Sequence, residues 1–178
     1  MAQPVTGRNE SSVLTGLFRD RTSAERAYNS LRERGYSDDE INVMMSDETR
    51  DKHYANGVET ELGNKALEGA GTGGAIGGVL GAVIGGIAAI GTNVLLPGLG
   101  LVVAGPIAAA LVGAGAGGAT GGLVGALIGW GIPEERAKYY EEGIREGGTV
   151  VGVSPRTTED ADYFESEWKT YNGEHIYR

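Results

Sequence analysis

Hydrophobic positions fall into short runs at both ends of the chain and into one long apolar tract between them. Residues 13–18, 41–45 and 149–153 are brief apolar runs bounded by polar residues or glycine, and each predicts a strand. Residues 174–177 predict a final short edge strand. The two flanks are therefore expected to supply the strands of one small sheet.

Amphipathic segments with helix-start signals lie between these runs. Thr22 and Glu25 form a capping box for a helix that ends at Gly35. Ser37 and Glu40 have the same spacing and predict one further helical turn before the second strand. A strand, a helix and a strand thus follow one another before the tract, as in a parallel βαβ unit.

Two more helices are predicted after the tract. The first begins at Pro133 and stops before Gly147, and the second begins at Thr157 and closes at Asn172 and Gly173. The order β-α-β therefore appears once on each side of the tract. Two such units side by side predict an α+β fold, a ferredoxin-like split βαβ sandwich interrupted by a long glycine-zipper helical hairpin.

The domain boundaries follow the changes in composition along the 178 residues. Residues 1–11 are expected to form a disordered tail, and residues 12–66 the first βαβ half with a polar loop. Residues 67–131 are the inserted hairpin, and residues 132–178 are the exit helix and the second βαβ half. Without the insertion, the flanks are long enough for one modest core.

The central tract carries no charge. Residues 69–133 contain no charged side chain in 65 positions, and 22 of these positions are glycine. Residues 69–85 align with residues 113–129 at an offset of 44, and 12 of the 17 positions are identical. Glycine recurs every fourth residue in both copies, which places these glycines on one face of a helix. The tract therefore predicts two glycine-zipped helices.

The two helices are expected near residues 67–92 and 104–130, joined by a turn at Pro97, Gly98 and Gly100. At 1.5 Å per residue each helix is about 38 Å long, and a hydrocarbon core is about 30 Å thick. The sequence therefore predicts a helical hairpin long enough to cross a bilayer, with both ends on the same side.

Glycine periodicity indicates that close helix packing is the purpose of the tract. A glycine inside a helix costs about 1 kcal/mol relative to alanine, so neither helix is stable alone in water. Packing of bare glycine faces offsets this cost, as it does between membrane helices. The helix-packing and oligomer contacts are predicted at Gly73, Gly77, Gly81, Gly85, Gly117, Gly121, Gly125 and Gly129.

Three surroundings for the hairpin stay open. Its length and lack of charge favour a bilayer. Residues 71–92 hold only seven large aliphatic side chains, and Thr72, Thr92 and Asn93 disfavour insertion. The alternatives are the buried core of a soluble homo-oligomer and a monomer with the hairpin folded onto its own domain.

Charge and composition exclude several classes of function. The net charge is -9 and lies wholly in the flanks, which argues against nucleic acid and against anionic lipid headgroups. The chain has no cysteine, so disulfides and thiolate chemistry are absent. Residues 1–12 lack the apolar core of a secretory signal, so an intracellular location is expected.

No group of residues has the spacing of a catalytic, cofactor or metal site. His53 and His175 are isolated and are expected to be exposed and unliganded. Glu141, Glu142 and Glu146, beside Arg145, could form an acid pair for chemistry, but they are expected to form a solvated helix face. The chain is therefore predicted not to be an enzyme.

The tract also contains a glycine motif that resembles a nucleotide-binding sequence, and a tryptophan lies at the end of its second copy. Gly69, Gly71 and Gly74 match a dinucleotide fingerprint, but no strand precedes them and no acidic residue follows at the required distance. We therefore expect no nucleotide at this place. Trp130, at the end of the second copy, fits either a membrane interface or a soluble core.

The order of motifs resembles the bacterial general stress protein 17M-like (YflT-type) proteins over about residues 12–154. The most specific part is Gly-Ile-Pro-Glu-Glu at residues 131–135, followed by Tyr-Tyr-Glu-Glu-Gly at residues 139–143 and Gly-Gly-Thr-Val-Val at residues 147–151. The resemblance implies a bacterial stress-associated protein, with no catalytic residue to carry over. Members with a long zipper resemble membrane proteins.

These observations predict a non-enzymatic, stress-associated structural protein that oligomerises through the hairpin. Its expected place is the cytoplasmic membrane, with the acidic domain in the cytoplasm, and its expected partners are itself and the lipid bilayer. The alternative is a soluble cytoplasmic ring, shell or filament with the hairpins as its buried core. A third hypothesis, a small-ligand sensor, rests on fold analogy alone. No cofactor and no specific ligand are predicted.

Overall fold

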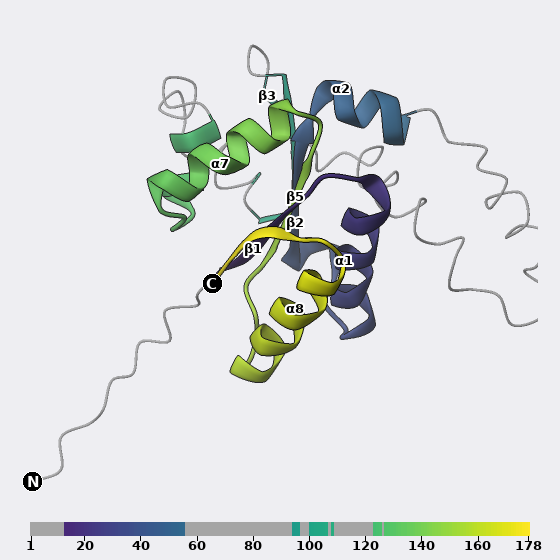
Figure 1. The fold of residues 1–178 in the computed structure, drawn as a ribbon, viewed down its shortest axis with the longest axis vertical. Helices are drawn as coiled ribbons and strands as arrows, with labels where there is room; N and C mark the ends of the chain where they lie inside the picture. Colours follow the sequence, from purple (N-terminus) through teal and green to yellow (C-terminus); the bar gives the residue numbers. More distant parts are fainter. Residues whose placement is uncertain (1–12, 56–93, 97–99, 107, 109–122, 126) are drawn as a thin grey trace, which may run out of the picture.

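The computed structural model describes residues 13–55, 94–96, 100–106, 108, 123–125 and 127–178, which are built around a six-stranded sheet (Figure 1). The strands are β1 (Leu14–Phe18), β2 (Ile41–Ser46), β3 (Val94–Leu96), β4 (Leu101–Ala104), β5 (Thr149–Val153) and β6 (Glu174–Tyr177). The helices are α1 (Arg21–Glu33), η1 (Asp38–Glu40), α2 (Asp47–Arg50), η2 (Asp51–Ala55), α7 (Glu134–Arg145) and α8 (Thr158–Thr170). The strand order is β3-β4-β2-β5-β1-β6, and every neighbouring pair is antiparallel.

Helices cover both faces of this sheet. Helices α1 and α8 pack on one face, called here the α1 face, and α7 packs on the other, called here the α7 face (Figure 1). Strand β5 shows the division, because Val151 and Val153 belong to the core on the α1 face and Val150 belongs to the core on the α7 face. Alternate side chains of a strand point to opposite faces. The apolar runs of the sequence are thus strands buried on both sides, which explains why they do not alternate with polar residues.

The ends of the helices share one hydrogen-bond pattern. After α1, Gly35 has φ +83°, its N–H donates to Arg32 O, and the N–H of Tyr36 donates to Leu31 O. This is a Schellman motif, in which a left-handed residue turns the chain away from the helix axis. Gly147 after α7 and Asn172 after α8 are also left-handed, so the predicted helix stops are confirmed.

The mixed α+β prediction is confirmed, and so are the strands and helices expected in the flanks. The capping box of Ser37 and Glu40 opens η1 as expected. The polar segment after β2 was expected to be a loop, and this is wrong for residues 47–55, which form α2 and η2. Asp47 and Glu48 follow the N-cap Ser46 and favour this short helix through its dipole. The predicted tail, residues 1–11, lies outside the described residues.

The connection between the two glycine-rich copies differs from the prediction. It was expected to be a turn between helices, but it contains strands β3 and β4, which pair with each other and extend the sheet beyond β2. Val103 of β4 lies opposite Met44 of β2. The expected start of the second helix at residue 104 is therefore wrong, because Ala104 is the last residue of β4. The run of β-branched and aliphatic residues at 101–103 favours a strand, and the turn signals lie between the two strands.

This pairing changes the expected position of the connection between the two copies. In a membrane hairpin, the connection between two spanning helices lies on the far side of the bilayer. Here the connection is part of the same sheet as β2 and β5. The predicted hairpin helices themselves lie outside the described residues, apart from residue 106, residue 108 and the helical end at residues 123–125 and 127–129. In the described parts of the chain, no helix is long and apolar enough to cross a membrane.

Candidate interaction site at the second glycine-rich copy

The predicted packing glycines divide into those that the structure describes and those that it does not. Gly73, Gly77, Gly81, Gly85, Gly117 and Gly121 lie outside the described residues. Gly125 and Gly129 lie in the helical residues that end the second copy. The geometry of the site is therefore given by its last two glycines and their neighbours.

This helical end has one buried side and one open side. Leu123 and Leu127 are four residues apart, are buried, and belong to the core on the α7 face. A Cβ atom built at Gly125 or Gly129 meets no atom of the described residues within 4 Å, and Ile128 is 44% exposed. The leucines therefore hold the segment on its own domain, and the glycines are not used in that contact.

A Schellman motif fixes the end of this helical segment. The N–H of Gly131 donates to Ile128 O at 2.9 Å, and the N–H of Ile132 donates to Leu127 O at 3.0 Å. Gly131 has φ +91°, which only glycine adopts without strain. Ile132 and Leu127 both lie in the core on the α7 face, the hydrophobic contact that accompanies this motif. The glycine face is thus held in a defined orientation relative to the sheet.

Trp130 anchors the same segment to the middle of the sheet. It is half-buried and packs against the core on the α7 face. A Cβ atom on Gly152 of β5 would lie 2.5 Å from Trp130 Cη2, so the ring occupies the space above this glycine. Trp130 therefore packs as a core residue, the second of the two interpretations that its sequence position allowed.

Helix α7 continues this anchor across the sheet. A Cβ atom on Gly143 would lie 2.3 Å from Leu17 Cδ2, so α7 crosses β1 at unusually short range. The hydroxyl of Tyr140 donates to His175 O at 2.6 Å and lies 2.9 Å from Thr15 Oγ1. Burial raises the pKa of Tyr140 to about 12. The phenol is therefore a neutral structural group that joins α7 to β1 and β6.

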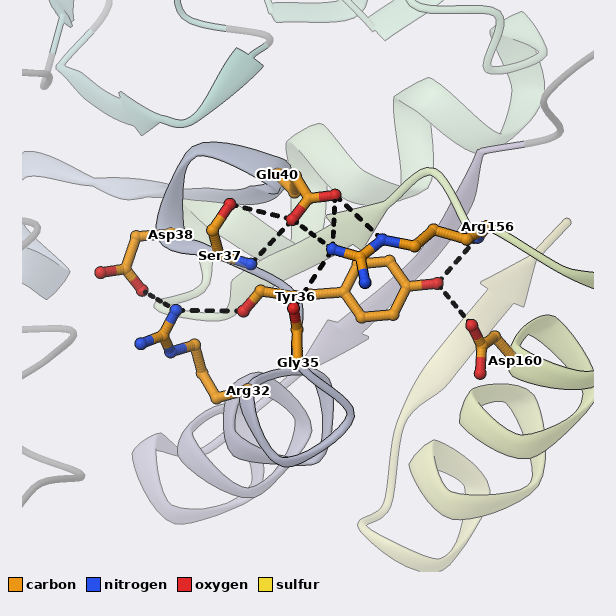
Figure 2. Close-up of polar contacts among 8 residues, drawn as sticks. All are labelled: Arg32, Gly35, Tyr36, Ser37, Asp38, Glu40, Arg156 and Asp160. Carbon is orange, nitrogen blue, oxygen red and sulfur yellow. Dashed lines mark hydrogen bonds and ion pairs between the residues drawn. The ribbon is translucent and has the colours of Figure 1, made fainter.

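A second group of polar residues lies at the loops that end the sheet (Figure 2). Arg156, in the loop from β5 to α8, pairs with Glu40 through both Nε and Nη2. The hydroxyl of Tyr36 donates to Asp160 Oδ2 at 2.8 Å and accepts from the backbone N–H of Arg156 at 2.8 Å. The guanidinium of Arg156 also lies 4.3 Å from the centre of the Tyr36 ring. Two loops far apart in sequence are thus clasped together.

The pairing in this group indicates a structural role. Glu40 accepts from Arg156 and also from the backbone and hydroxyl of Ser37, and these bonds lower its pKa to about 2. Burial raises the pKa of Tyr36, which keeps it protonated. A general base needs a pKa near the working pH, and a carboxylate with a pKa of about 2 is a poor one. The group therefore joins loops and does not supply acid–base chemistry.

The ion pair of Glu40 with Arg156 should make the stability of the protein depend on pH. Because folding lowers the pKa of Glu40 from 4.5 to about 2, its contribution is present above pH 4.5 and is lost as the pH falls to about 2. We expect Glu40→Gln to lower the melting temperature at neutral pH and to lose less stability than the wild type on acidification. Thermal unfolding followed at a series of pH values measures both effects.

A matched substitution controls for the loss of a surface charge. Glu165→Gln removes an exposed carboxylate that pairs with Lys169 within α8. Such a pair contributes about 0.3–0.5 kcal/mol, so this variant should follow the wild-type pH profile closely. If the melting temperature of Glu40→Gln falls in parallel with that of the wild type down to pH 2, the ion pair of Glu40 with Arg156 does not contribute to stability.

The other candidate residues of the sequence lie at the surface. His53 and His175 are both exposed, and His175 stacks on Tyr139 with ring centres 4.5 Å apart. Arg145 pairs with Glu141 within α7, as expected for a solvated helix face. Among the residues that the structure describes, no three His, Cys, Asp or Glu side chains are grouped to hold a metal ion.

Sequence reasoning missed the residues that attach the tract to the domain. Leu123 and Leu127 look like any aliphatic positions of a zipper helix, and Gly152 looks like an ordinary strand glycine. The clasp of Tyr36 with Arg156 was also missed, because its members are 120 residues apart. Comparison with protein-family models, with curated proteins and with solved structures gives no match.

Proposed function

We propose that this protein is a non-enzymatic structural protein that assembles with copies of itself through the glycine faces of its two zipper copies. The observation that carries the proposal is the division of the second copy into a buried leucine side and an open glycine side. Leu123 and Leu127 are buried against the domain. A Cβ atom at Gly125 or Gly129 would meet no atom of the described residues within 4 Å. A bare glycine face allows close approach of another helix and recovers the helical cost of the glycines.

The arrangement of the folded domain supports a scaffold role. Its polar groups at the loop ends are paired with each other, as Arg156 is with Glu40, and its core fills both faces of the sheet. Strands β2, β5, β1 and β6 with α1 and α8 also have the order of a ferredoxin-like sandwich, which we propose as its fold type. The bacterial stress association follows from the family resemblance and is part of the same proposal.

The geometry favours protein over lipid as the surroundings of the second copy. Ala108, five residues before the second copy, and Leu123 within it are both buried in the core on the α7 face. At both of these described positions the chain lies on its own domain, which supports protein over lipid as the surroundings of the second copy. A soluble assembly is therefore the form that we propose first.

Membrane association is the second candidate, and the 65 uncharged positions favour it. Residues 56–93 are long enough to enter and leave one leaflet. Washing of membranes with carbonate separates the two forms, because an embedded protein stays in the pellet and a soluble assembly moves to the supernatant. Recovery wholly in the washed pellet would favour the membrane form.

Substitution of the open glycines tests self-assembly. We expect the wild type to form particles larger than a monomer and Gly125→Leu or Gly129→Leu to reduce them to monomers, because leucine separates the packed helices. The Cβ has open space in the domain, so neither variant should lower the melting temperature. Size-exclusion chromatography with light scattering, without detergent, measures the mass.

The control places the same side chain elsewhere on the surface. Lys138→Leu adds an exposed leucine on α7, where the lysine pairs with its own helix neighbour Glu134. This variant should assemble like the wild type. A monomeric wild type, or full assembly by both glycine variants, would contradict the proposal.

A further inference from the structure

Asn172 and Gly173 form the turn that joins helix α8 to strand β6. Asn172 is exposed and has φ +58°, in the left-handed region. The N–H of Gly173 donates to Trp168 O at 2.8 Å, which is the longer of the two hydrogen bonds of a Schellman motif. The turn therefore ends α8 and sets the direction in which β6 begins.

The fold constrains both residues of this turn. Among residues with a side chain, asparagine and aspartate enter the left-handed region at the least cost, so position 172 favours asparagine. A Cβ atom on Gly173 would lie 2.7 Å from Trp168 O and 3.0 Å from Phe18 Cε1, so position 173 needs glycine. The turn thus selects Asn-Gly, a dipeptide that cyclises readily because glycine leaves its backbone nitrogen unhindered.

An Asn-Gly pair modifies itself without an enzyme. The backbone nitrogen of Gly173 loses its proton and attacks Cγ of the Asn172 side chain, which forms a cyclic imide and releases ammonia. Water then opens the ring at either of its carbonyl carbons and leaves aspartate or isoaspartate. In isoaspartate the main chain runs through Cβ and Cγ, so it is one atom longer. Water is the co-reactant, and nothing is oxidised or reduced.

The folded structure holds the attacking nitrogen out of this reaction. The nitrogen attacks only after its proton has left, and in the fold this proton is bonded to Trp168 O. Trp168 is fully buried, and Gly173 packs closely beside Phe18 and Ile176. The last turn of α8 must therefore open before the ring forms. The rate of the reaction then follows the population of this locally opened state.

The attachment of β6 to the sheet controls how often the turn opens. Strand β6 pairs with β1 at Thr15 with Tyr177 and at Leu17 with Glu174, and the register shifts between these pairs. His175 lies at the shift and has φ +49°. A strand as short and irregular as this has few ladder hydrogen bonds, so side chains contribute much of its attachment.

Side chains from β1 and α7 hold β6 in place. The Nε of Arg19 donates to Glu174 Oε2 at 2.9 Å, and the same guanidinium pairs with Glu146 at the end of α7. The hydroxyl of Tyr140 donates to His175 O at 2.6 Å. The Arg19 side chain is 43% exposed, so its contacts can be removed without opening the core.

We propose that Asn172 is a site of spontaneous deamidation, that the Schellman turn keeps the reaction slow, and that isoaspartate at this position releases β6 from the sheet. The added main-chain atom changes the spacing between Trp168 O and the N–H of residue 173, which the turn requires. Without β6, strand β1 (Leu14–Phe18) becomes an edge with unpaired backbone groups. The modification therefore limits the lifetime of the folded domain.

Peptide mapping by mass spectrometry measures the reaction. The wild type is kept in mildly alkaline buffer, folded or in urea, and the products at residue 172 are quantified against time. Asn56, which glycine also follows, is the reference in urea. We expect similar rates at both positions in urea, and a rate at residue 172 at least about tenfold lower in the folded protein. No reaction at residue 172 in urea, or equal rates with and without urea, would overturn the proposal.

Arg19→Gln tests whether the attachment of β6 controls the turn. In the folded protein it should accelerate deamidation at Asn172 about two- to fivefold, because it removes two exposed ion pairs, and in urea it should change nothing. Arg145→Gln is the matched control, since this exposed arginine pairs with Glu141 within α7. It should keep the wild-type rate. No acceleration in Arg19→Gln, or equal acceleration in both variants, would show that β6 does not govern the reaction.

Hydrogen exchange measures the release of β6. Aged wild type contains unmodified and isoaspartate chains, whose peptides over residues 171–178 separate after exchange. We expect the isoaspartate peptide to lose the amide protection that the unmodified peptide keeps. Asn172→Asp carries the charge of the product on a normal main chain and should stay protected, because aspartate also adopts the left-handed region. Equal protection of the isoaspartate and unmodified peptides would overturn the release of β6.

Discussion

Gly105→Ala is expected to unfold much of the protein. Gly105 has φ +93°, and a Cβ atom there would lie 2.1 Å from Ile41 O and 2.9 Å from Ile41 C. The left-handed conformation alone costs an alanine about 1–2 kcal/mol. The clash is with backbone at the start of β2, which cannot move without disturbing the pairing of β2 with β5. We expect a loss of at least about 3 kcal/mol, a large part of the stability of a domain of this size.

Gly35→Ala provides the matched control for this substitution. Gly35 has φ +83°, close to that of Gly105, but a Cβ atom there meets nothing within 4 Å. It should therefore cost only the conformational free energy of a left-handed alanine, about 1–2 kcal/mol. Urea unfolding followed by circular dichroism gives both free energies. Equal losses for the two variants would show that Gly105 does not press against Ile41 and that β4 enters the sheet differently.

The position of Gly105 also explains why its effect extends to the tract. It lies between β4 and Ala108, which is buried in the core on the α7 face five residues before the second copy. The chain must turn there from the plane of the sheet to one of its faces. A side chain at residue 105 would displace this turn together with the start of the second copy. Loss of stability and loss of assembly are therefore expected together in Gly105→Ala, whereas Gly129→Leu separates them.

The flanks were predictable because their signals are local. The capping box at Ser37 and the stops at Gly35 and Gly147 each act within a few residues. One start was misplaced by a neighbour, since Asp20 and not Thr22 accepts from the N–H of Ser23 as the N-cap of α1. Such shifts of one or two residues leave the order of elements unchanged.

The connection between the glycine-rich copies was predicted wrongly because its structure depends on a distant partner. Residues 101–104 are apolar and short, and alone they fit the start of a helix as well as a strand. Pairing with β2, more than 50 residues earlier, makes them a strand. The same holds for Trp130, whose place is set by the bare surface at Gly152. Neither partner is visible in local periodicity.

The sequence predicts that the candidate site is a face of glycines. It does not predict which side of the helical segment packs on the sheet. Fourfold glycine spacing gives one bare face whether the helix is in lipid, in an oligomer or on its own domain. Leu123 and Leu127 decide which side of the segment faces the sheet, because they are buried in the core on the α7 face that also contains Met44 and Val150. A pattern within one helix gives its faces, but only the packing partner determines which face remains available.

Trp168→Ala is expected to cause the largest loss among core substitutions on the α1 face. Trp168 is fully buried, its ring lies 5.7 Å from that of Phe18 at 81°, and its Nε1–H donates to Ser30 Oγ at 3.2 Å. Truncation of a buried tryptophan costs about 3–5 kcal/mol, and here it also leaves the Ser30 hydroxyl with one partner fewer. Urea unfolding measured by circular dichroism, which does not depend on tryptophan fluorescence, gives the free energy.

Trp130→Ala tests whether the end of the second copy packs on the sheet, and its unfolding free energy is compared with that of Trp168→Ala. Trp130 is only half-buried, and it stands above Gly152 on the opposite face of the sheet. Its removal should cost less than that of Trp168, about 1–3 kcal/mol, because it exposes surface without opening a closed cavity. If the tract were held away from the domain, Trp130→Ala would leave the unfolding free energy unchanged. A measurable loss therefore ties the end of the second copy to the sheet.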